Sequence, residues 1–220
     1  MMLDKNKIDN FFARRARLTN PKIATHYKED DSIEYDIELI RKYVQPDSVV
    51  LDLGCGPGRT TNLLEPHVSF IKAVDKQQNF LDFCTRSFKI ETVKAELTEF
   101  LDTNKYDVIL LFGVLNYFND NDAATIYRNC YSMLKDDGVL LVKHACGIQD
   151  DVIIDKYSEQ IGDWYHVLYR QINNDEILLH KTGFETERIN IYPDRLNPWD
   201  NTHYYAFVAK KSHSTIHGNI

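Results

Sequence analysis

The chain has 220 residues and a formal net charge of −7 at pH 7, and 43% of its residues are hydrophobic and 27% charged. This length fits one domain, with or without a cap, and is ample for a hydrophobic core. The composition is that of an ordinary globular protein, and the acidic balance argues against non-specific nucleic-acid binding, which depends on neutralising phosphates.

The sequence shows no sign of a membrane segment or a metal site. No apolar stretch approaches the length of a membrane span, and residues 1–10 are charged and lack an apolar signal core. We therefore expect a cytoplasmic protein without a membrane partner. The four cysteines, Cys55, Cys84, Cys130 and Cys146, lack a Cys-x-x-Cys pair and are expected to be reduced thiols. The eight histidines form no ligand-spaced cluster, so no metal is predicted.

The first predicted helix spans residues 4–18, where apolar side chains recur at helical spacing. It carries Arg14, Arg15 and Arg17. These arginines have two interpretations. They form either a solvated helix edge or a set of guanidinium groups for an anionic part of a substrate, such as a phosphate or carboxylate.

A second helix is predicted over residues 33–43, just before the first strand. Together the two helices form a predicted N-terminal helical cap, residues 1–45. His26 and Tyr27 lie between the helices. We interpret them either as residues at the mouth of a cofactor pocket or as ordinary packing of a linker.

The most informative stretch, residues 49–58, reads Val-Val-Leu-Asp-Leu-Gly-Cys-Gly-Pro-Gly. An apolar run that ends in an acid predicts a buried parallel strand, and the glycines predict a tight turn in which backbone approaches a ligand closely. Threonines at 60 and 61 are typical of a helix start. Strand, glycine loop and helix together indicate the entry of a nucleotide-binding βαβ unit.

The spacing of the glycines indicates which nucleotide. Gly54, Gly56 and Gly58 give Gly-x-Gly-x-Gly, whereas a dinucleotide loop requires a glycine where this chain has Arg59, and no Lys-Ser/Thr follows. The stretch resembles motif I of the class I S-adenosylmethionine (SAM)-dependent methyltransferases. The resemblance implies that SAM is the cofactor, that the three glycines fit around it and that Asp52 lies near its cationic end.

The second predicted strand, residues 70–74, ends at Asp75. An acid at this point lies beside the glycine loop, at the switch point of an open α/β sheet, where two ribose hydroxyls can donate to one carboxylate. We therefore predict that Asp75 holds the ribose and that Lys76, which follows it, belongs to the cofactor site.

Two further segments extend the predicted cofactor site. After a short third strand, residues 91–94, the resemblance implies that Glu96 accepts from the adenine amino group and that Leu97 packs on the ring; Glu96 departs from the commoner Asp. After the fourth strand, residues 106–112, the resemblance implies that the backbone of Phe112 and Gly113 contacts the cofactor. Five consecutive apolar residues in that strand favour a central position in the sheet.

The loop after the fourth strand resembles the family's fourth motif, and the resemblance implies that Asn116 and Tyr117 face the substrate. Its sequence is not Asn/Asp-Pro-Pro-Tyr/Phe, which argues against methylation of the exocyclic amine of adenine or of an amide. Residues 145–170 are predicted to form a lid-like insertion, the usual place of a substrate lid in the family. Further substrate residues are predicted in this insertion and in the loop at 193–202: Trp164, Tyr165, Arg170 and Trp199, with His26 from the cap. Simple packing of the aromatic side chains is the alternative.

A general base is sought among the histidines, because methyl transfer to a hydroxyl benefits from one whereas an amine needs only its neutral form. His144 follows the fifth strand, residues 139–143, at the end of the sheet where ligands bind, and is the first candidate. His203, at the start of the last strand, is the second. His26 and His166 are further candidates, and each of the four has ordinary packing as its alternative.

Five strand–helix units in succession predict a doubly wound α/β fold independently of any family. The complete prediction is a seven-stranded, mostly parallel Rossmann-like sheet with a helical cap and a lid after strand five. Its last two strands are antiparallel. The predicted organisation is a cap at 1–45, a methyltransferase domain at 46–210 that contains the lid at 145–170, and a polar tail at 211–220.

We predict that the protein moves a methyl group from SAM to a hydroxyl or amine of a small polar acceptor, such as a sugar, nucleotide-sugar or phosphorylated metabolite. Aromatic faces stack on sugars and bases, and arginines clamp phosphates. The alternatives are a methyltransferase that acts on RNA or protein and a SAM-binding domain without catalysis. A nicotinamide oxidoreductase is disfavoured by the glycine spacing. Nucleic acid is not expected as a partner, and the prediction leaves monomer and homodimer open.

Overall fold

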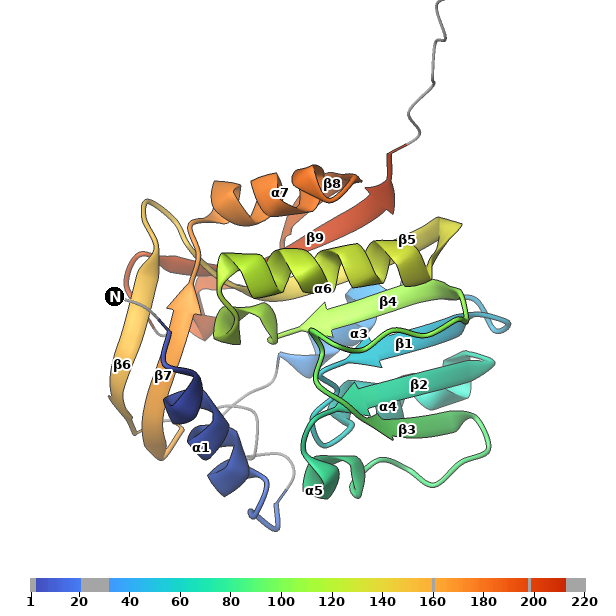
Figure 1. The fold of residues 1–220 in the computed structure, drawn as a ribbon, viewed down its shortest axis with the longest axis horizontal. Helices are drawn as coiled ribbons and strands as arrows, with labels where there is room; N and C mark the ends of the chain where they lie inside the picture. The colour runs from blue at the N-terminus through green and yellow to red at the C-terminus, as the bar shows by residue number, and fades with distance from the viewer. Residues whose placement is uncertain (1–2, 21–31, 160, 198, 213–220) are drawn as a thin grey trace, which may run out of the picture.

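A computed structural model describes residues 3–20, 32–159, 161–197 and 199–212. In these residues the chain forms two sheets with helices on both faces of the larger one (Figure 1). The strands are β1 (Val49–Leu53), β2 (Phe70–Asp75), β3 (Ile90–Lys94), β4 (Tyr106–Phe112), β5 (Leu134–Gly147), β6 (Val152–Ser158), β7 (Asp163–Tyr169), β8 (Phe184–Asn190) and β9 (Thr202–Lys211). The helices are α1 (Lys5–Arg15), α3 (Ile33–Arg41), α4 (Arg59–Leu64), α5 (Gln78–Leu81), α6 (Asp120–Met133) and α7 (Ile172–Lys181), with short 3₁₀ turns η1 (Glu65–His67), η2 (Leu115–Tyr117) and η3 (Asp194–Leu196).

The large sheet has seven strands in the order β3-β2-β1-β4-β5-β9-β8. The pairs β1–β2, β2–β3, β1–β4 and β4–β5 are parallel, and β9 pairs antiparallel with both β5 and β8. The predicted fold is therefore confirmed, including the antiparallel last strands. The direction of strand order reverses between β1 and β4, which creates a crevice for a ligand at the carboxyl ends of these strands.

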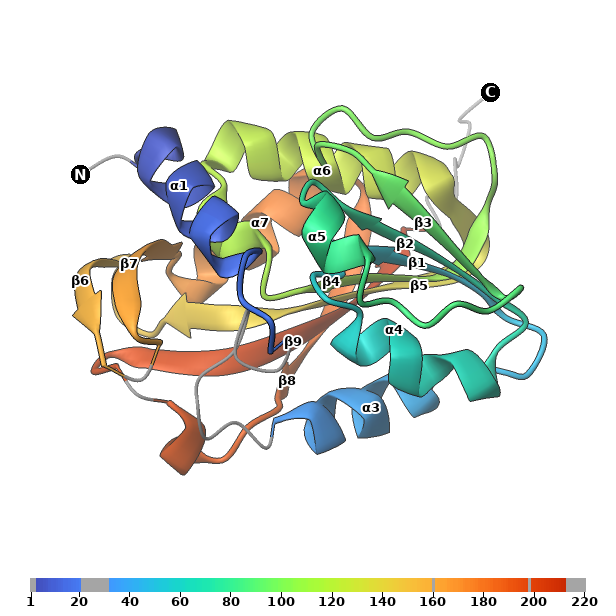
Figure 2. The same ribbon diagram turned by 90° about the horizontal axis from the view of Figure 1, so that it is seen from below.

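Alternation along the central strands divides the apolar side chains between two cores. Val50 of β1 belongs to a cluster with Ile40 of α3 and Leu64 of α4, whereas its neighbour Leu51 packs with Ile126 of α6 on the opposite face. Figure 2 shows α3 and α4 on one side of the sheet and α6 on the other. Because successive side chains of a strand point to opposite faces, continuous apolar runs are what a sheet covered on both sides requires.

The first helix differs from its prediction. Asp4 caps α1 by accepting from the backbone nitrogen of Asn6 at 2.9 Å, and α1 ends three residues earlier than the predicted helix. Helix α5 is short and ends at Leu81. The side chain of Asn62 accepts from the backbone nitrogen of Thr85 at 2.7 Å, and this bond takes a donor that a longer helix would use.

The predicted lid is an antiparallel hairpin, β6–β7, which packs against α1. Arg15 of α1 donates to the carbonyl of Ile161 at 2.6 Å, and Lys7 pairs with Asp155 at 2.7 Å. Figure 1 shows α1 beside β7, to one side of the large sheet. Helix α1 and the hairpin therefore form one wall beside the carboxyl ends of β4 and β5. In the described part of the chain, no helix combines the length and apolar character needed to cross a membrane.

Candidate active site

A cavity of about 710 Å³ opens at the carboxyl ends of the parallel strands, between the large sheet, α1 and the hairpin. Nine of the predicted cofactor residues and three of the predicted substrate residues line it. These are Asp52, Gly54, Gly56, Asp75, Lys76, Glu96, Leu97, Phe112 and Gly113 for the cofactor, and Asn116, Tyr117 and Tyr165 for the substrate. Residues far apart in the sequence thus meet around one space, although their individual roles stay predictions.

The glycine loop has the backbone geometry that only glycine tolerates well. Gly54 has φ of +71°, and a Cβ added there would lie 2.5 Å from Cγ2 of Val114. Gly58 does not line the cavity; with φ of +73° it precedes α4, and a Cβ there would lie 2.7 Å from Sγ of Cys84. The loop therefore packs against the segment after β4 and against Cys84, which follows α5, and its backbone is held close to the cavity.

Asp75 is fixed by backbone donors at the end of β2. Its Oδ2 accepts from the nitrogen of Gly56 at 3.0 Å, and its Oδ1 accepts from the nitrogen of Gln77 at 2.8 Å. Burial raises the pKa of the carboxyl, although both backbone bonds act in the opposite direction. The acid predicted to hold a ribose therefore has a fixed orientation.

Asp52 is the second buried acid of the cavity. Its Oδ2 accepts from the hydroxyl of Thr61 at 2.6 Å. Burial raises the pKa of Asp52 to about 6; the Thr61 bond opposes this effect and the nearby charge of Asp75 adds to it. Two carboxylates that are buried close together repel each other, so a cation between them is favoured. The site thus fits a positively charged ligand.

Lys76 links the cofactor side of the cavity to α1. Its ammonium pairs with Asp9 of α1 and lies 3.7 Å from a carboxylate oxygen of Glu96. Glu96 and Leu97 follow β3, as predicted, and line the cavity next to Asp75. Helix α1 is consequently tied to both the hairpin and the cofactor side, and it covers the space between them.

The predicted substrate residues that line the cavity form a polar aromatic surface. The hydroxyl of Tyr117 lies 3.3 Å from that of Tyr165, which lies 3.2 Å from the hydroxyl of Tyr169. The amide nitrogen of Asn116 donates to the carbonyls of Ala145 at 2.8 Å and Leu168 at 3.0 Å. Asn116 therefore ties the loop after β4 to both β5 and the hairpin.

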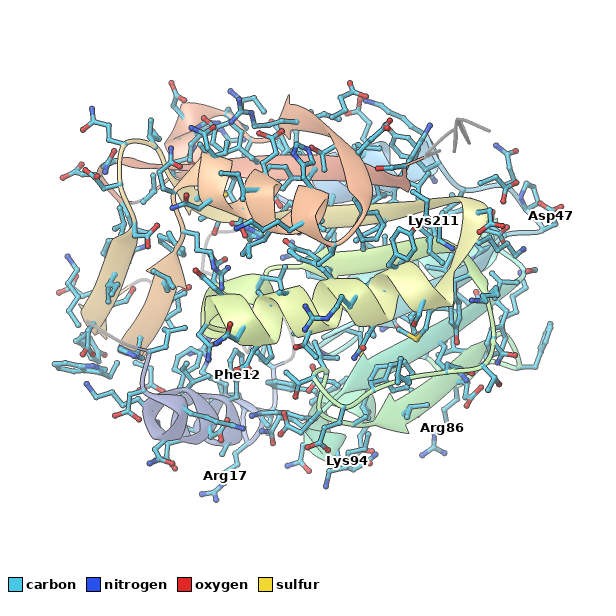
Figure 3. All side chains as sticks on the ribbon, turned by 45° about the horizontal axis from the view of Figure 1, so that its top comes forward. Phe12, Arg17, Asp47, Arg86, Lys94 and Lys211 are labelled. Carbon is cyan, nitrogen blue, oxygen red and sulfur yellow. The ribbon has the colours of Figure 1, made fainter. Side chains whose placement is uncertain are left out.

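Helix α1 also lines the cavity, with Phe12, which was not predicted as a site residue, and with Arg15, one of the three arginines for which a substrate role was left open. Phe12 lines the cavity and packs edge-on against Tyr117, with ring centroids 4.8 Å apart. Arg15 also lines it and is 5% exposed, whereas Arg14 is exposed and pairs with Asp163 at 2.9 Å. In Figure 3, Phe12 points toward the body of the molecule and Arg17, just beyond α1, points away. Of the three arginines, only Arg15 has the position of a ligand group.

His144 is not placed to act as a base, so the first prediction is wrong. Its side chain is fully buried, does not line the cavity, and lies with Nε2 2.7 Å from Oδ2 of Asp175 on α7. Arg170 also pairs with Asp175, at 3.4 Å, and these partners outweigh burial and lower the pKa of that carboxyl. Cys146 completes a group whose potential ligand atoms lie within 4.8 Å. The guanidinium of Arg170 gives the carboxylate of Asp175 a positively charged partner within this group.

Other predicted residues also lie away from the cavity. His203 contacts the side-chain oxygen of Asn190 on the neighbouring strand β8, and His166 accepts from the nitrogen of Asp4 at 2.9 Å. Arg170 is buried and donates to the carbonyl of Leu115, so it supports η2 from behind. These contacts contradict the roles predicted for His203 as base and for Arg170 in substrate binding.

The predicted tryptophans differ in position. Trp164 is exposed on the hairpin and donates to Asp155 at 2.6 Å. Trp199 stacks on Tyr165 with ring centroids 6.5 Å apart, but it does not line the cavity itself. Trp199 therefore supports the cavity wall, and a substrate contact of either tryptophan stays a prediction. His26 and Tyr27 lie outside the described residues.

Among the other polar residues that line the cavity, one group was missed by the sequence analysis: Lys143 at the end of β5, Asp36 of α3 and Tyr192 after β8. The ammonium of Lys143 lies 3.1 Å from Oδ2 of Asp36, and the hydroxyl of Tyr192 donates to Oδ1 of Asp36 at 2.6 Å. Strand alternation gave a signal for Lys143, because it points to the face opposite His144. Nothing in the sequence indicated that Asp36 and Tyr192 meet.

The chain is similar in sequence to a protein family and to several known proteins. The family described as "Methyltransferase domain" matches residues 50–138. The carboxy-S-adenosyl-L-methionine synthase of Shewanella woodyi is 25% identical over 147 residues, which cover 62% of this chain and 58% of that protein. The N-terminal Xaa-Pro-Lys N-methyltransferase 1 of Ailuropoda melanoleuca is 27% identical over 180 residues, which cover 73% of this chain and 78% of that protein.

A solved structure shows the same fold. The complex of DhpI with S-adenosylhomocysteine (SAH) superposes with a TM-score of 0.72 at 14% identity and covers 94% of this chain and 97% of that one. At this identity the likeness establishes the fold alone. The residues around the cavity therefore have to be interpreted from their own chemistry.

Proposed function

We propose that the chain is a class I SAM-dependent methyltransferase and that it transfers the methyl group of SAM to a hydroxyl or amine of a small polar acceptor that carries an anionic group. Sugars, nucleotide-sugars and phosphorylated metabolites include such acceptors. One observation carries the proposal: the cavity continues from the predicted cofactor residues to the buried Arg15 and the tyrosines of the hairpin.

The residues present fit SAM, which supplies an activated methyl group on a positively charged sulfur. Asp75 offers a carboxylate for ribose hydroxyls, and Glu96 and Leu97 offer an acceptor and an apolar surface for adenine. Asp52 offers a buried negative charge for the cationic part of the molecule. What the protein contributes is alignment of the acceptor and exclusion of water.

The acceptor side has the chemistry for an anionic, partly planar molecule. Arg15 is held between the ring of Phe11, 5.7 Å from the guanidinium carbon, and the carbonyl of Ile161. Burial lowers the pKa of Arg15, and the proximity of Asp163 and Tyr117 opposes this effect. A guanidinium in an aromatic wall binds phosphate or carboxylate oxygens strongly because few waters compete.

No histidine lines the cavity among the described residues. An amine acceptor reacts in its neutral form and needs no base from the protein. A hydroxyl acceptor would use a carboxylate of the cavity wall as its base. The proposal therefore keeps both acceptor atoms open.

The cover provided by α1 and the hairpin favours a small acceptor over a macromolecule. Helix α1 is joined to the hairpin through Lys7 and Asp155, and to the cofactor side through Asp9 and Lys76. A polynucleotide or a folded protein would have to displace these contacts to reach the carboxyl ends of the strands. The name of the Ailuropoda relative nevertheless makes a Xaa-Pro-Lys peptide an acceptor worth testing.

The proposal is tested with SAM labelled in its methyl group and three acceptor pools: a metabolite extract below about 1 kDa, total RNA, and a mixture of proteins with a Xaa-Pro-Lys peptide. We expect label in the metabolite pool, in a product whose formation is abolished by phosphatase treatment or by removal of acidic metabolites. Label in RNA or peptide, or none in any pool, would contradict the proposal. Mass spectrometry of the nucleosides also detects carboxy-SAM, the compound named in the Shewanella relative.

A further inference from the structure

A buried ion pair lies in the cavity wall beyond the predicted cofactor residues. The ammonium of Lys143 on β5 and the carboxylate of Asp36 on α3 are 3.1 Å apart, and the hydroxyl of Tyr192 donates to the other carboxylate oxygen at 2.6 Å. All three residues line the cavity and are at most 5% exposed. The pair therefore faces the cavity that the predicted cofactor residues also line.

Aromatic rings hold the ammonium group at the end of the sheet. Its nitrogen lies 5.1 Å from the ring centroid of Phe112 and 5.2 Å from that of Tyr192. Burial acts to lower the pKa of Lys143, but Asp36 and Tyr192 outweigh it and the pKa is raised. Lys143 thus carries a positive charge next to Phe112, the last residue of β4 and a predicted cofactor residue.

The order of the strands places this pair at the end of the row of strand ends along which the predicted cofactor residues lie. Glu96 and Leu97 follow β3 and Asp75 ends β2, and the next strands in the sheet are β1, β4 and β5. Neighbouring strands are about 4.8 Å apart. A molecule with its adenine at β3 and its ribose at β2 therefore extends over β1 and β4 toward the side chain of Lys143.

We propose that Lys143 and Asp36 bind the amino-acid end of SAM, with the ammonium of Lys143 on the α-carboxylate and the carboxylate of Asp36 on the α-ammonium group. Tyr192 is a positioning residue that fixes the orientation of Asp36. The inference rests on the proposed function for the identity of the cofactor. It makes the ion pair the element that separates SAM and SAH from adenosyl thioethers without an amino-acid end.

Charge complementarity explains why the pair lies in the cavity wall. The amino-acid end of SAM carries a carboxylate and an ammonium group close together, as the ion pair does. When each lies against its opposite in the pair, positive and negative groups alternate, and every charged group has two oppositely charged neighbours. A buried ion pair by itself contributes little to stability compared with apolar side chains of similar size. Stability alone therefore gives no reason for a charged pair at this position.

The chain contains a matched control with the same three residue types. Lys72 pairs with Asp102, and the hydroxyl of Tyr106 donates to Asp102 at 2.6 Å. None of these three residues lines the cavity. Substitution of Lys72 thus disrupts a partly buried Lys–Asp–Tyr group that lies outside the cavity, where a bound ligand would not contact it.

The test is calorimetric titration with SAH and with 5′-methylthioadenosine, which has the adenosyl group but no amino-acid end. For Lys143→Met we expect about tenfold or greater loss of SAH affinity, since a hydrogen bond to a charged group contributes about 1.5–3 kcal/mol, with methylthioadenosine affinity unchanged within about twofold. Tyr192→Phe should weaken SAH binding less, and Lys72→Met should change neither affinity. Circular dichroism identifies the temperature range in which every variant is folded.

Two results would overturn the inference: wild-type SAH affinity in Lys143→Met, or equal losses for SAH and methylthioadenosine. The second result would assign the pair a structural role. Neither ligand requires an acceptor, so the outcome is independent of whether an anionic acceptor is found. Normal SAH binding without transfer to any small acceptor would contradict the proposed function and leave this inference in place.

Discussion

The carboxylate of Asp75 accepts a hydrogen bond from the backbone nitrogen of Gly56 at 3.0 Å. This bond joins the end of β2 to the glycine loop that follows β1, so the acid and the loop keep a fixed spacing. The second oxygen of the carboxylate accepts from the nitrogen of Gln77 at 2.8 Å, which fixes its orientation. A ribose would meet an acceptor that needs no rearrangement to bind it.

Substitution of Asp75 should therefore act on cofactor binding. We expect Asp75→Ala to weaken SAH binding by about 10- to 100-fold, because the variant loses a charged acceptor for two hydroxyls. Calorimetry gives the affinity and circular dichroism the fold. Asp47→Ala is the control, because Asp47 is exposed in a loop far from the cavity (Figure 3). Unchanged SAH affinity in Asp75→Ala would show that the ribose is held elsewhere.

Asp52 should make the stability of the ligand-free protein depend on pH. Its pKa is about 6 in the folded protein and 3.8 as an ordinary carboxyl group, so the folded state holds the proton more tightly. This contribution to stability is present below pH 3.8 and is lost as the pH rises through 6. The full difference corresponds to about 3 kcal/mol.

Asp52→Asn tests this expectation, since the amide oxygen can still accept from Thr61. Without ligand, the variant should match the wild type near pH 4 and exceed its free energy of unfolding by up to about 3 kcal/mol above pH 7. Denaturant titrations at pH 4, 6 and 8 give the comparison. The same variant should bind SAH more weakly at pH 8. A stability difference that does not change with pH would contradict the account of Asp52.

Arg15 should determine the affinity for an anionic acceptor. We expect Arg15→Met to raise the acceptor KM by about 10- to 100-fold, because a bond between a charged donor and acceptor is lost, while SAH affinity stays the same. Arg14→Met is the matched control, since Arg14 neighbours Arg15 but is exposed and pairs with Asp163. Equal effects of the two substitutions would remove Arg15 from the acceptor site.

His144 should matter for stability and not for the site. His144→Leu removes the ring whose Nε2 lies 2.7 Å from the buried carboxylate of Asp175, and we expect a loss of about 1–3 kcal/mol in the free energy of unfolding. SAH affinity should be unchanged wherever the variant is folded. His180→Ala, at an exposed position on the same helix as Asp175, is the control. A variant of normal stability that lacks methyl transfer would restore His144 as a base.

The fold and the cofactor side were predictable because their signals are local. An apolar strand, three glycines and the acids at strand ends are close in the sequence, and parallel strands bring their carboxyl ends to one edge of the sheet. The residues from Asp52 to Gly113 could therefore be placed around one cavity without knowledge of side-chain contacts.

The rest of the site depends on contacts between distant segments. Arg15 and Asp36 precede the first strand and Tyr192 follows the eighth, and no local pattern indicates that they meet. On β5 the prediction chose His144 where Lys143 faces the cavity. Alternation indicates that Lys143 and His144 point to opposite faces of the strand, but both faces are covered, so no pattern of polar and apolar residues identifies which face borders the cavity.

A crystal structure of the complex with SAH is the measurement that tests this account most directly. It should show adenine beside Glu96 and Leu97, the ribose hydroxyls on Asp75, and the amino-acid end on Lys143 and Asp36. The sulfur should then face the space bounded by Arg15 and Tyr117, where the acceptor is expected. SAH with its sulfur directed away from that space, or bound outside the cavity, would contradict the account.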